Sequence, residues 1–416
     1  MRRLLNLVAP VVLLALPAPA LADTADLARA ALSASTVAAR DSALAELDAM
    51  KARDPLAAYA LGSAQFFVAL EKLGTGLHRH GFESPQSFML PLMRLPVPVN
   101  PDPEPLTYEG FRQILADFHD AMAQSAASLA MVPADADIGI EVDLNELGID
   151  LNEDGNIAPD ESAAAIMASL ASGGVTPPEA PPALVFRFDR ADGYWLQGYA
   201  NFLMAQADFW LAHDFRLAFD QSFHMLFPKA RLPMQDTLVP LDDGSGGMFA
   251  SEWRIADFVS FIHLINWPVA EPERSKAART ELLEMIRLSR EDWKAIRAET
   301  DNDREWLPGP QQTGANQLTG LEITEQEVQA WHVALQMAED LLEGRRLLPH
   351  FRFADKGINM KRFFDEPQTF DLVLSITGPA IVPYLEQGPM LTSEEWWALQ
   401  EQFGATGFVT FALWAN

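Results

Sequence analysis

The 416-residue sequence predicts a mainly α, multi-helical globular domain with a few short strands. Apolar residues make up 49% of the chain and charged residues 21%, which is a globular balance with enough apolar material for a core. Apolar residues recur mostly at helical spacing, whereas alternation with a period of two is confined to short stretches. These two observations favour helices packed on helices over a sheet-based fold.

The first 22 residues have the pattern of a secretory signal peptide. Met1 to Arg3 form a basic start, residues 4–16 form an apolar run, and residues 20–22 read Ala-Leu-Ala, a small-x-small cleavage site. We therefore expect cleavage after Ala22 and a periplasmic or secreted protein. No later stretch reaches about 18 uninterrupted apolar residues, so we expect no integral membrane segment after cleavage.

Charge and cysteine content exclude several classes of function. Acidic residues outnumber basic ones 58 to 30, and the net charge of −28 disfavours nucleic acid as a partner while being compatible with cation binding. The absence of cysteine excludes disulfides, thiolate nucleophiles, iron–sulfur clusters and Cys-ligated zinc.

Residues 23–132 are predicted to form an N-terminal helical region. Asp54 followed by Pro55 is a helix cap with proline at the first helical position, and Thr107 is predicted to cap a later helix. The Pro-rich residues 75–106 between these helices are predicted to form a long loop.

Residues 133–183 are acidic and then Pro-rich, which separates them in composition from residues 184–416. The latter are predicted to form a C-terminal, mainly helical region packed against residues 23–132. Within it, residues 193–227 are apolar on nearly every side and predict one central buried helix. Further elements are expected as helices at 251–266, 273–298 and 324–343, a strand-like run at 370–376, and a helix capped by Thr392.

Residues 150–161 carry the most specific motif of the chain. They match the pattern D-x-[DN]-x-[DN]-G-x₅-E at every defined position. Calcium takes six to eight oxygen ligands, and a twelve-residue loop can supply them from alternate positions. The predicted metal ligands are the side chains of Asp150, Asn152, Asp154 and Glu161 and the backbone carbonyl of Asn156.

This segment resembles an EF-hand calcium loop. Gly155, at the sixth position, permits the sharp turn, and Ile157, at the eighth, is the apolar residue that pins such a loop to a neighbour. Ala158, at the ninth, offers no side-chain oxygen, so water would fill that place. The resemblance implies Ca²⁺ as the bound ion and a helix that leaves the loop after Glu161.

Two features differ from the usual EF-hand arrangement of a helix before the loop and a second, paired hand. Residues 138–144 alternate with a period of two and predict a strand before the loop. Residues 301–305 begin like a second loop, but Trp306 stands where glycine is needed. The resemblance therefore implies calcium binding rather than calcium-switched binding of a target.

Weaker patterns leave alternative functions open. On the predicted helix 193–227, four polar side chains fall in one stripe, which is either a hydrogen-bonded network or a binding or active site: Gln206, His213, Asp220 and His224. A basic island at 345–362 either pairs with the protein's own acids or holds an anion, and its members are Arg345, Arg346, His350, Arg352, Lys356, Lys361 and Arg362. His119 and Asp120 have the pattern of ordinary helix positions.

No standard catalytic motif is present, so a binding protein is favoured over an enzyme. The best prediction is a periplasmic or secreted calcium-binding protein in which calcium stabilises a loop of a large helical domain. The alternative is a periplasmic ligand-binding protein or an enzyme that uses the polar stripe of 193–227 or the basic island.

Overall fold

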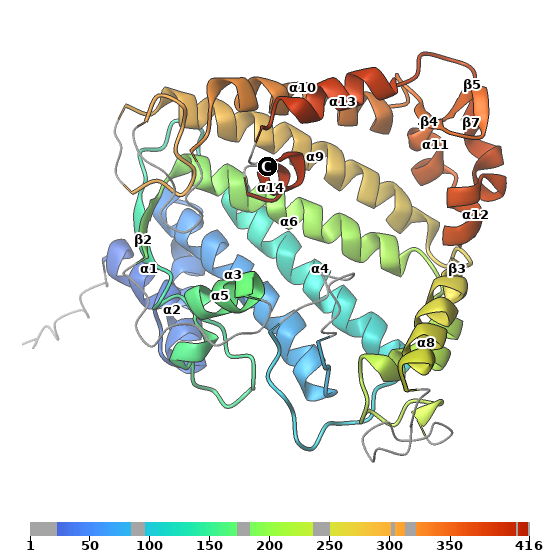
Figure 1. The fold of residues 1–416 in the computed structure, drawn as a ribbon. Helices are drawn as coiled ribbons and strands as arrows, with labels where there is room; N and C mark the ends of the chain where they lie inside the picture. Colours follow the sequence, from blue (N-terminus) through green and yellow to red (C-terminus); the bar gives the residue numbers. More distant parts are fainter. Residues whose placement is uncertain are drawn as a thin grey trace, which may run out of the picture.

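The computed structural model of the chain consists mainly of helices with a few short antiparallel strands (Figure 1), which confirms the predicted fold class. It describes residues 23–84, 96–172, 184–235, 250–300, 304–312, 322–404 and 407–414. The predicted signal peptide and the Pro-rich residues 177–182 lie outside these ranges.

The N-terminal region contains α1 (Thr24–Leu32), α2 (Val37–Met50), α3 (Pro55–Arg79) and α4 (Tyr108–Ala130). Both predicted caps are confirmed: Asp54 accepts the N–H of Leu56 at 2.9 Å, and Thr107 accepts the N–H of Gly110 at 3.0 Å. The loop prediction for 75–106 is wrong at its start, because α3 continues to Arg79 and buries Leu77 in a second core of aromatic side chains.

The central layer of the fold places α3, α4, α6 (Arg190–Leu211) and α9 (Pro272–Ala298) side by side in that order (Figure 1), with extensive contacts between neighbours. Their apolar faces share one hydrophobic core, which extends from Leu27 near the N-terminus to Phe411 near the C-terminus. Close packing of α3 on α4 requires Gly62, because a Cβ there would lie 2.6 Å from Cγ of Leu129.

The prediction of one helix over 193–227 is wrong. Helix α6 ends at Leu211, and the chain turns before α7 (Arg216–Ser222) and the 3₁₀ turn η3 (Phe223–Met225). The guanidinium of Arg112 on α4 donates to the carbonyl oxygens of Leu211 and His213 at 2.8 Å each. These bonds satisfy backbone groups that a continuing helix would have paired internally, so the helix can end inside the fold.

The remaining elements after α7 include α8 (Ala250–Leu264), β3 (Asn266–Trp267), α10 (Glu325–Leu342), β4 (Leu348–His350), β5 (Phe353–Ile358), α11 (Met360–Asp365), β6 (Phe370–Asp371), α12 (Leu372–Thr377), η6 (Pro379–Tyr384), β7 (Leu385–Glu386), α13 (Ser393–Glu401) and α14 (Phe408–Trp414). Helices α10 and α13 lie along one edge of the central layer (Figure 1). Thr392 and Glu395 form the predicted capping box of α13.

The strand-like prediction for 370–376 is correct only for its first two residues. Asp371 accepts the N–H of Leu374 at 2.7 Å and thereby caps the short helix α12, in place of an extended strand.

Strand β1 (Ile140–Asp143) pairs antiparallel with β2 (Val185–Phe188), so the strand predicted before the loop is confirmed. The loop 150–161 comes after β1. Its last three residues form η2 (Pro159–Glu161), and α5 (Ala163–Ser172) follows the loop.

Among the helices in the described ranges, none combines the length and the apolar character needed to span a membrane.

Candidate metal centre

Loop 150–161 is closed at its base by backbone hydrogen bonds between the residues that precede and follow it. The N–H of Ile149 donates to the carbonyl of Glu161 at 3.2 Å, and the N–H of Ala163 donates to the carbonyl of Leu147 at 2.7 Å. The residues that close the loop, 147–149, are not helical, and a turn at 144–146 separates them from the predicted strand, β1.

Asp150, at the first position of the loop, is buried and has one carboxylate oxygen without a partner. Its Oδ2 accepts the N–H of Gly155 at 2.9 Å. Its Oδ1 is buried without a hydrogen-bond partner among the described residues. Gly155 has a φ of 82°, in the left-handed region that favours glycine, and so brings its N–H back toward Asp150. An unpaired buried carboxylate oxygen is costly unless a cation or a donor reaches it.

The third, fifth and seventh positions form two successive turns at the surface. Oδ1 of Asn152 accepts the N–H of Asp154 at 2.9 Å, and Oδ1 of Asp154 accepts the N–H of Asn156 at 2.8 Å. These side chains are exposed, in contrast to Asp150. These bonds fold residues 152–156 into local turns, but Asp150, Asp154 and Glu161 are not among the groups of described residues whose ligand atoms all lie within 4.8 Å of one another.

Glu161, at the twelfth position, is buried and spans both ends of the loop. Its Oε1 accepts the N–H of Leu151 at 2.8 Å, and its Oε2 accepts the N–H of Ala158 at 3.0 Å. Burial raises the pKa of the Glu161 carboxyl, the N–H groups of Ala158 and Leu151 oppose this rise, and the Asp150 carboxylate adds to it. A carboxylate whose ionisation is opposed by burial and by a second carboxylate is stabilised by a nearby cation.

A buried ion pair supports the loop from behind. The guanidinium of Arg40 on α2 binds both carboxylate oxygens of Glu71 on α3, at 2.5 and 2.6 Å. Glu71 also accepts the N–H of Asp150 at 2.7 Å. The first ligand position of the loop is therefore fixed to two helices. Sequence analysis did not identify Arg40 or Glu71, because each lies in an ordinary helical pattern far from the loop.

Leu151 packs against α3 at Gly74, where a Cβ would lie only 2.4 Å from Cδ2 of Leu151. Leu151 is buried, although it belongs to a loop rich in polar residues. The second position of the loop is therefore part of the apolar packing of the N-terminal region.

The segment before α2 pairs with the middle of the loop. Asn156 forms an antiparallel bridge with Thr36. The N–H of Ile157 donates to the carbonyl of Ser35 at 3.0 Å, and the N–H of Val37 donates to the carbonyl of Gly155 at 3.1 Å. The middle of the loop is thus held in place by residues 35–37 of the same chain.

The predicted polar stripe is divided among different elements. Gln206 lies on α6, His213 in the turn after it, Asp220 on α7 and His224 in η3, so the helical spacing that defined the stripe does not apply. The His213 ring bonds the carbonyl of Phe209 through Nδ1 at 2.7 Å, and burial lowers its pKa. This histidine is a neutral, hydrogen-bonded side chain of the core.

Four of the seven members of the basic island pair with the protein's own carboxylates. Arg345 binds Asp340 at 2.8 Å, Arg346 binds Glu395 at 2.6 Å, and Arg362 binds Glu366 at 2.8 Å. Lys361 binds Asp365 at 2.6 Å. These contacts favour the interpretation of the island as a set of internal ion pairs over that of an anion site.

Comparisons with protein-family models, with curated proteins and with solved structures find no match to this chain.

Proposed function

We propose that the chain is a calcium-binding protein in which Ca²⁺ at loop 150–161 stabilises the helical domain. The observation that carries the proposal is Asp150, whose buried Oδ1 has no hydrogen-bond partner in the described part of the chain while its Oδ2 is fixed by Gly155. A calcium ion gives that oxygen a partner and relieves the repulsion between Asp150 and Glu161. The ligands are Asp150, Asn152, Asp154, Glu161 and the carbonyl of Asn156.

The supports of the loop favour a structural role for calcium over a switch. Glu71 and the segment around Thr36 already hold the loop against α2 and α3. The ion then adds a link between these helices and α5, which begins two residues after Glu161. The signal-peptide pattern adds that the protein works outside the cytoplasm, where calcium is abundant. Mass spectrometry of protein from its host should then show Asp23 as the N-terminal residue.

Isothermal titration and thermal unfolding with calcium test the proposal. We expect weak binding, with a dissociation constant of about 10⁻⁴ to 10⁻³ M, because the loop is unpaired and one position is left to water. Free calcium at a hundred times this constant stabilises the folded chain by about 2.7 kcal/mol. Magnesium should compete poorly, because it requires a tighter octahedron and gives up its waters reluctantly.

Two variants and one matched control locate the ion. Glu161→Ala should abolish the calcium-dependent rise in melting temperature, and Asn152→Ala should weaken it less, since it removes one neutral oxygen instead of two charged ones. Glu153→Gln removes a charge from the same loop, but Glu153 pairs with Arg79, which lies outside the loop. The Glu153→Gln chain should therefore bind calcium as the unmodified chain does. Equal responses of the Glu161 and Glu153 variants would exclude this site.

A further inference from the structure

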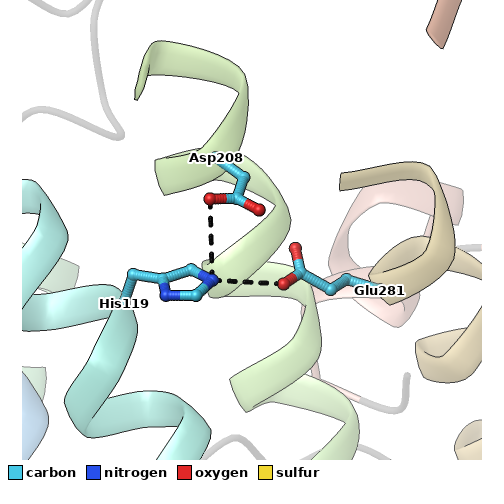
Figure 2. Close-up of side chains that lie close together, drawn as sticks. All are labelled: His119, Asp208 and Glu281. Atoms are coloured by element: carbon cyan, nitrogen blue, oxygen red, sulfur yellow. Dashed lines mark hydrogen bonds and ion pairs between the residues drawn. The ribbon is translucent and has the colours of Figure 1, made fainter. Parts of the chain in front are cut away.

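Three ligand-type side chains from three helices meet inside the central layer, outside loop 150–161. They are His119 of α4, Asp208 of α6 and Glu281 of α9 (Figure 2), here named the three-helix cluster. Nε2 of His119 lies 3.2 Å from Oε1 of Glu281 and 3.6 Å from Oδ1 of Asp208. The three ligand atoms all lie within 4.8 Å of one another.

The cluster is largely removed from solvent. The side chain of Asp208 is 2% exposed, that of His119 16% and that of Glu281 14%. The second carboxylate oxygen of Glu281, Oε2, is buried without a hydrogen-bond partner among the described residues. Such an oxygen is rare in folded proteins, because its lost hydration is normally replaced by a donor or a cation.

The histidine ring is oriented as it is in metal sites. Its Nδ1 lies 3.1 Å from Oδ1 of the neighbouring Asp120. An Nδ1–H donated to this carboxylate leaves the lone pair of Nε2 directed at Asp208 and Glu281, which is the carboxylate–histidine–metal arrangement. In that tautomer, Nε2 and the two carboxylates face one another as acceptors, and a cation placed among them can contact all three.

The spacing of the ligand atoms fits a small divalent ion. Metal–ligand bonds of 2.0–2.1 Å at the tetrahedral angle place neighbouring ligand atoms about 3.3 Å apart. The two distances from Nε2 lie on either side of this value. Calcium, which takes six to eight oxygen ligands, fits a cluster of three residues with one nitrogen ligand less well.

Arg274 fixes one carboxylate without blocking it. Its Nη1 lies 2.5 Å from Oδ1 of Asp208. A carboxylate has about four lone-pair sites, so Asp208 can accept from Arg274 and still bind an ion. With a neutral imidazole, the two carboxylates and Arg274 leave one net negative charge in the cluster, which favours a divalent cation.

A proton on Nε2 of His119 competes with a metal ion for the position between the three side chains. Hydrogen bonding to Glu281 raises the pKa of His119, and burial raises the pKa of Glu281. A single N–H on Nε2, however, can donate fully to only one of the two carboxylates that face it, and it leaves Oε2 of Glu281 without a partner.

We propose that His119, Asp208 and Glu281 bind one divalent transition-metal ion, with Zn²⁺ as the best fit, and that this ion links α4, α6 and α9. One nitrogen and two carboxylate ligands without sulfur suit Zn²⁺ among the available divalent ions. Three protein ligands leave the fourth position of a tetrahedral ion to water.

The test measures zinc binding in a chain whose calcium loop has been disabled by Asp150→Asn and Glu161→Gln. We expect this chain to retain one zinc ion after dialysis and to give the strong visible absorption of tetrahedral Co²⁺ when cobalt replaces zinc. His119→Gln and Glu281→Gln in the same chain should each lower zinc affinity by more than the roughly 10- to 100-fold that loss of an outer-shell partner costs. Both replacements keep a hydrogen-bonding side chain, and circular dichroism reports whether each variant folds.

His332→Gln is the matched control. His332 is a partly buried histidine of α10 whose Nδ1 contacts the carbonyl of Val328 at 2.8 Å, and its replacement should leave zinc binding unchanged. The proposal is overturned if folded His119→Gln or Glu281→Gln chains keep the same zinc affinity and cobalt spectrum. It is equally overturned if the parent chain binds no zinc at micromolar concentrations.

Discussion

Loop 150–161 and the three-helix cluster assemble metal-ligand side chains in opposite ways. The proposed ligands of the loop come from twelve consecutive residues, with the two carboxylates at its ends, Asp150 and Glu161, buried and its middle exposed. The proposed ligands of the cluster come from three helices, and His119 and Glu281 are 162 residues apart in the sequence. The loop is therefore visible as a motif, whereas the cluster exists only once α4, α6 and α9 have packed.

The two regions also differ in what holds their ligands in place. In the loop, backbone N–H groups orient the carboxylates, so the chain can form most of the site locally. In the cluster, rigid helices and Arg274 set the positions. The loop therefore depends on tertiary structure mainly through the residues of other elements that hold it in place. Substitutions at those supports and at the buried charges of the helical layer test this difference.

The largest effect is expected at the buried pair behind the loop. Glu71→Ala leaves Arg40 buried without its carboxylate and removes the acceptor of the Asp150 N–H. Breaking a buried pair by removing one partner costs about 3–5 kcal/mol of unfolding free energy. Urea denaturation should show this loss, and the double variant Arg40→Leu/Glu71→Leu should recover much of it. A single variant within the error of the parent chain would show that the loop needs no such support.

A smaller loss is expected where the loop packs on α3. Gly74→Ala places a Cβ against Leu151, which overfills the contact and should cost about 1–3 kcal/mol of unfolding free energy. It should also weaken calcium binding, because Leu151 neighbours Asp150 in the loop. Combining it with Leu151→Ala should restore part of both losses in thermal unfolding and titration. Additive losses in the double variant would mean that the two residues act separately.

Asp292 provides a buried carboxyl on the same helix as Glu281, but outside the cluster. Both its oxygens are buried without a hydrogen-bond partner in the described part of the chain. Burial raises its pKa well above the usual value, and the carboxylates of Asp192, Glu299 and Asp189 add to the rise. The folded chain therefore binds this proton more tightly than the unfolded chain does.

The pH dependence of Asp292→Asn follows from that direction. As pH rises above about 4, the unfolded chain releases the proton and the folded chain keeps it, so the parent loses stability at up to about 1.4 kcal/mol per pH unit until the folded group also ionises. Asparagine does not titrate. The unfolding free energy of Asp292→Asn minus that of the parent should therefore increase with pH, as measured by urea denaturation from acid to neutral pH. A difference in unfolding free energy that stays constant over this range would contradict the raised pKa of Asp292.

The smallest effect is expected at the exposed ion pair between α3 and loop 150–161. Arg79 binds Glu153 at the surface, with both side chains partly in solvent. Arg79→Ala should change the unfolding free energy by about 0–1 kcal/mol, and added salt should reduce even that difference. A loss of unfolding free energy as large as that of Glu71→Ala would mean that solvent exposure does not determine how much each ion pair contributes to stability.

Much of the fold could be predicted from local patterns. The helix caps at Asp54, Thr107 and Thr392 and the strand before the loop were correct, because each depends on residues within a few positions of one another. The single helix over 193–227 was wrong, because its interruption depends on Arg112 of a different helix. The end of α3 was misplaced for a similar reason, since the burial of Leu77 is decided by a distant aromatic core.

The sequence by itself determined the mainly helical class and the order of the candidate ligands in loop 150–161, since helical periodicity and a twelve-residue motif are encoded by neighbouring residues. Only the tertiary structure decided that Glu71 supports Asp150, that Thr36 pairs with Asn156, and that His119, interpreted from sequence as an ordinary helix position, faces Asp208 and Glu281. The physical reason is that helices expose the same local pattern wherever they pack. Which side chains meet between them is set by the packing of whole apolar faces, and no short stretch of sequence records that choice.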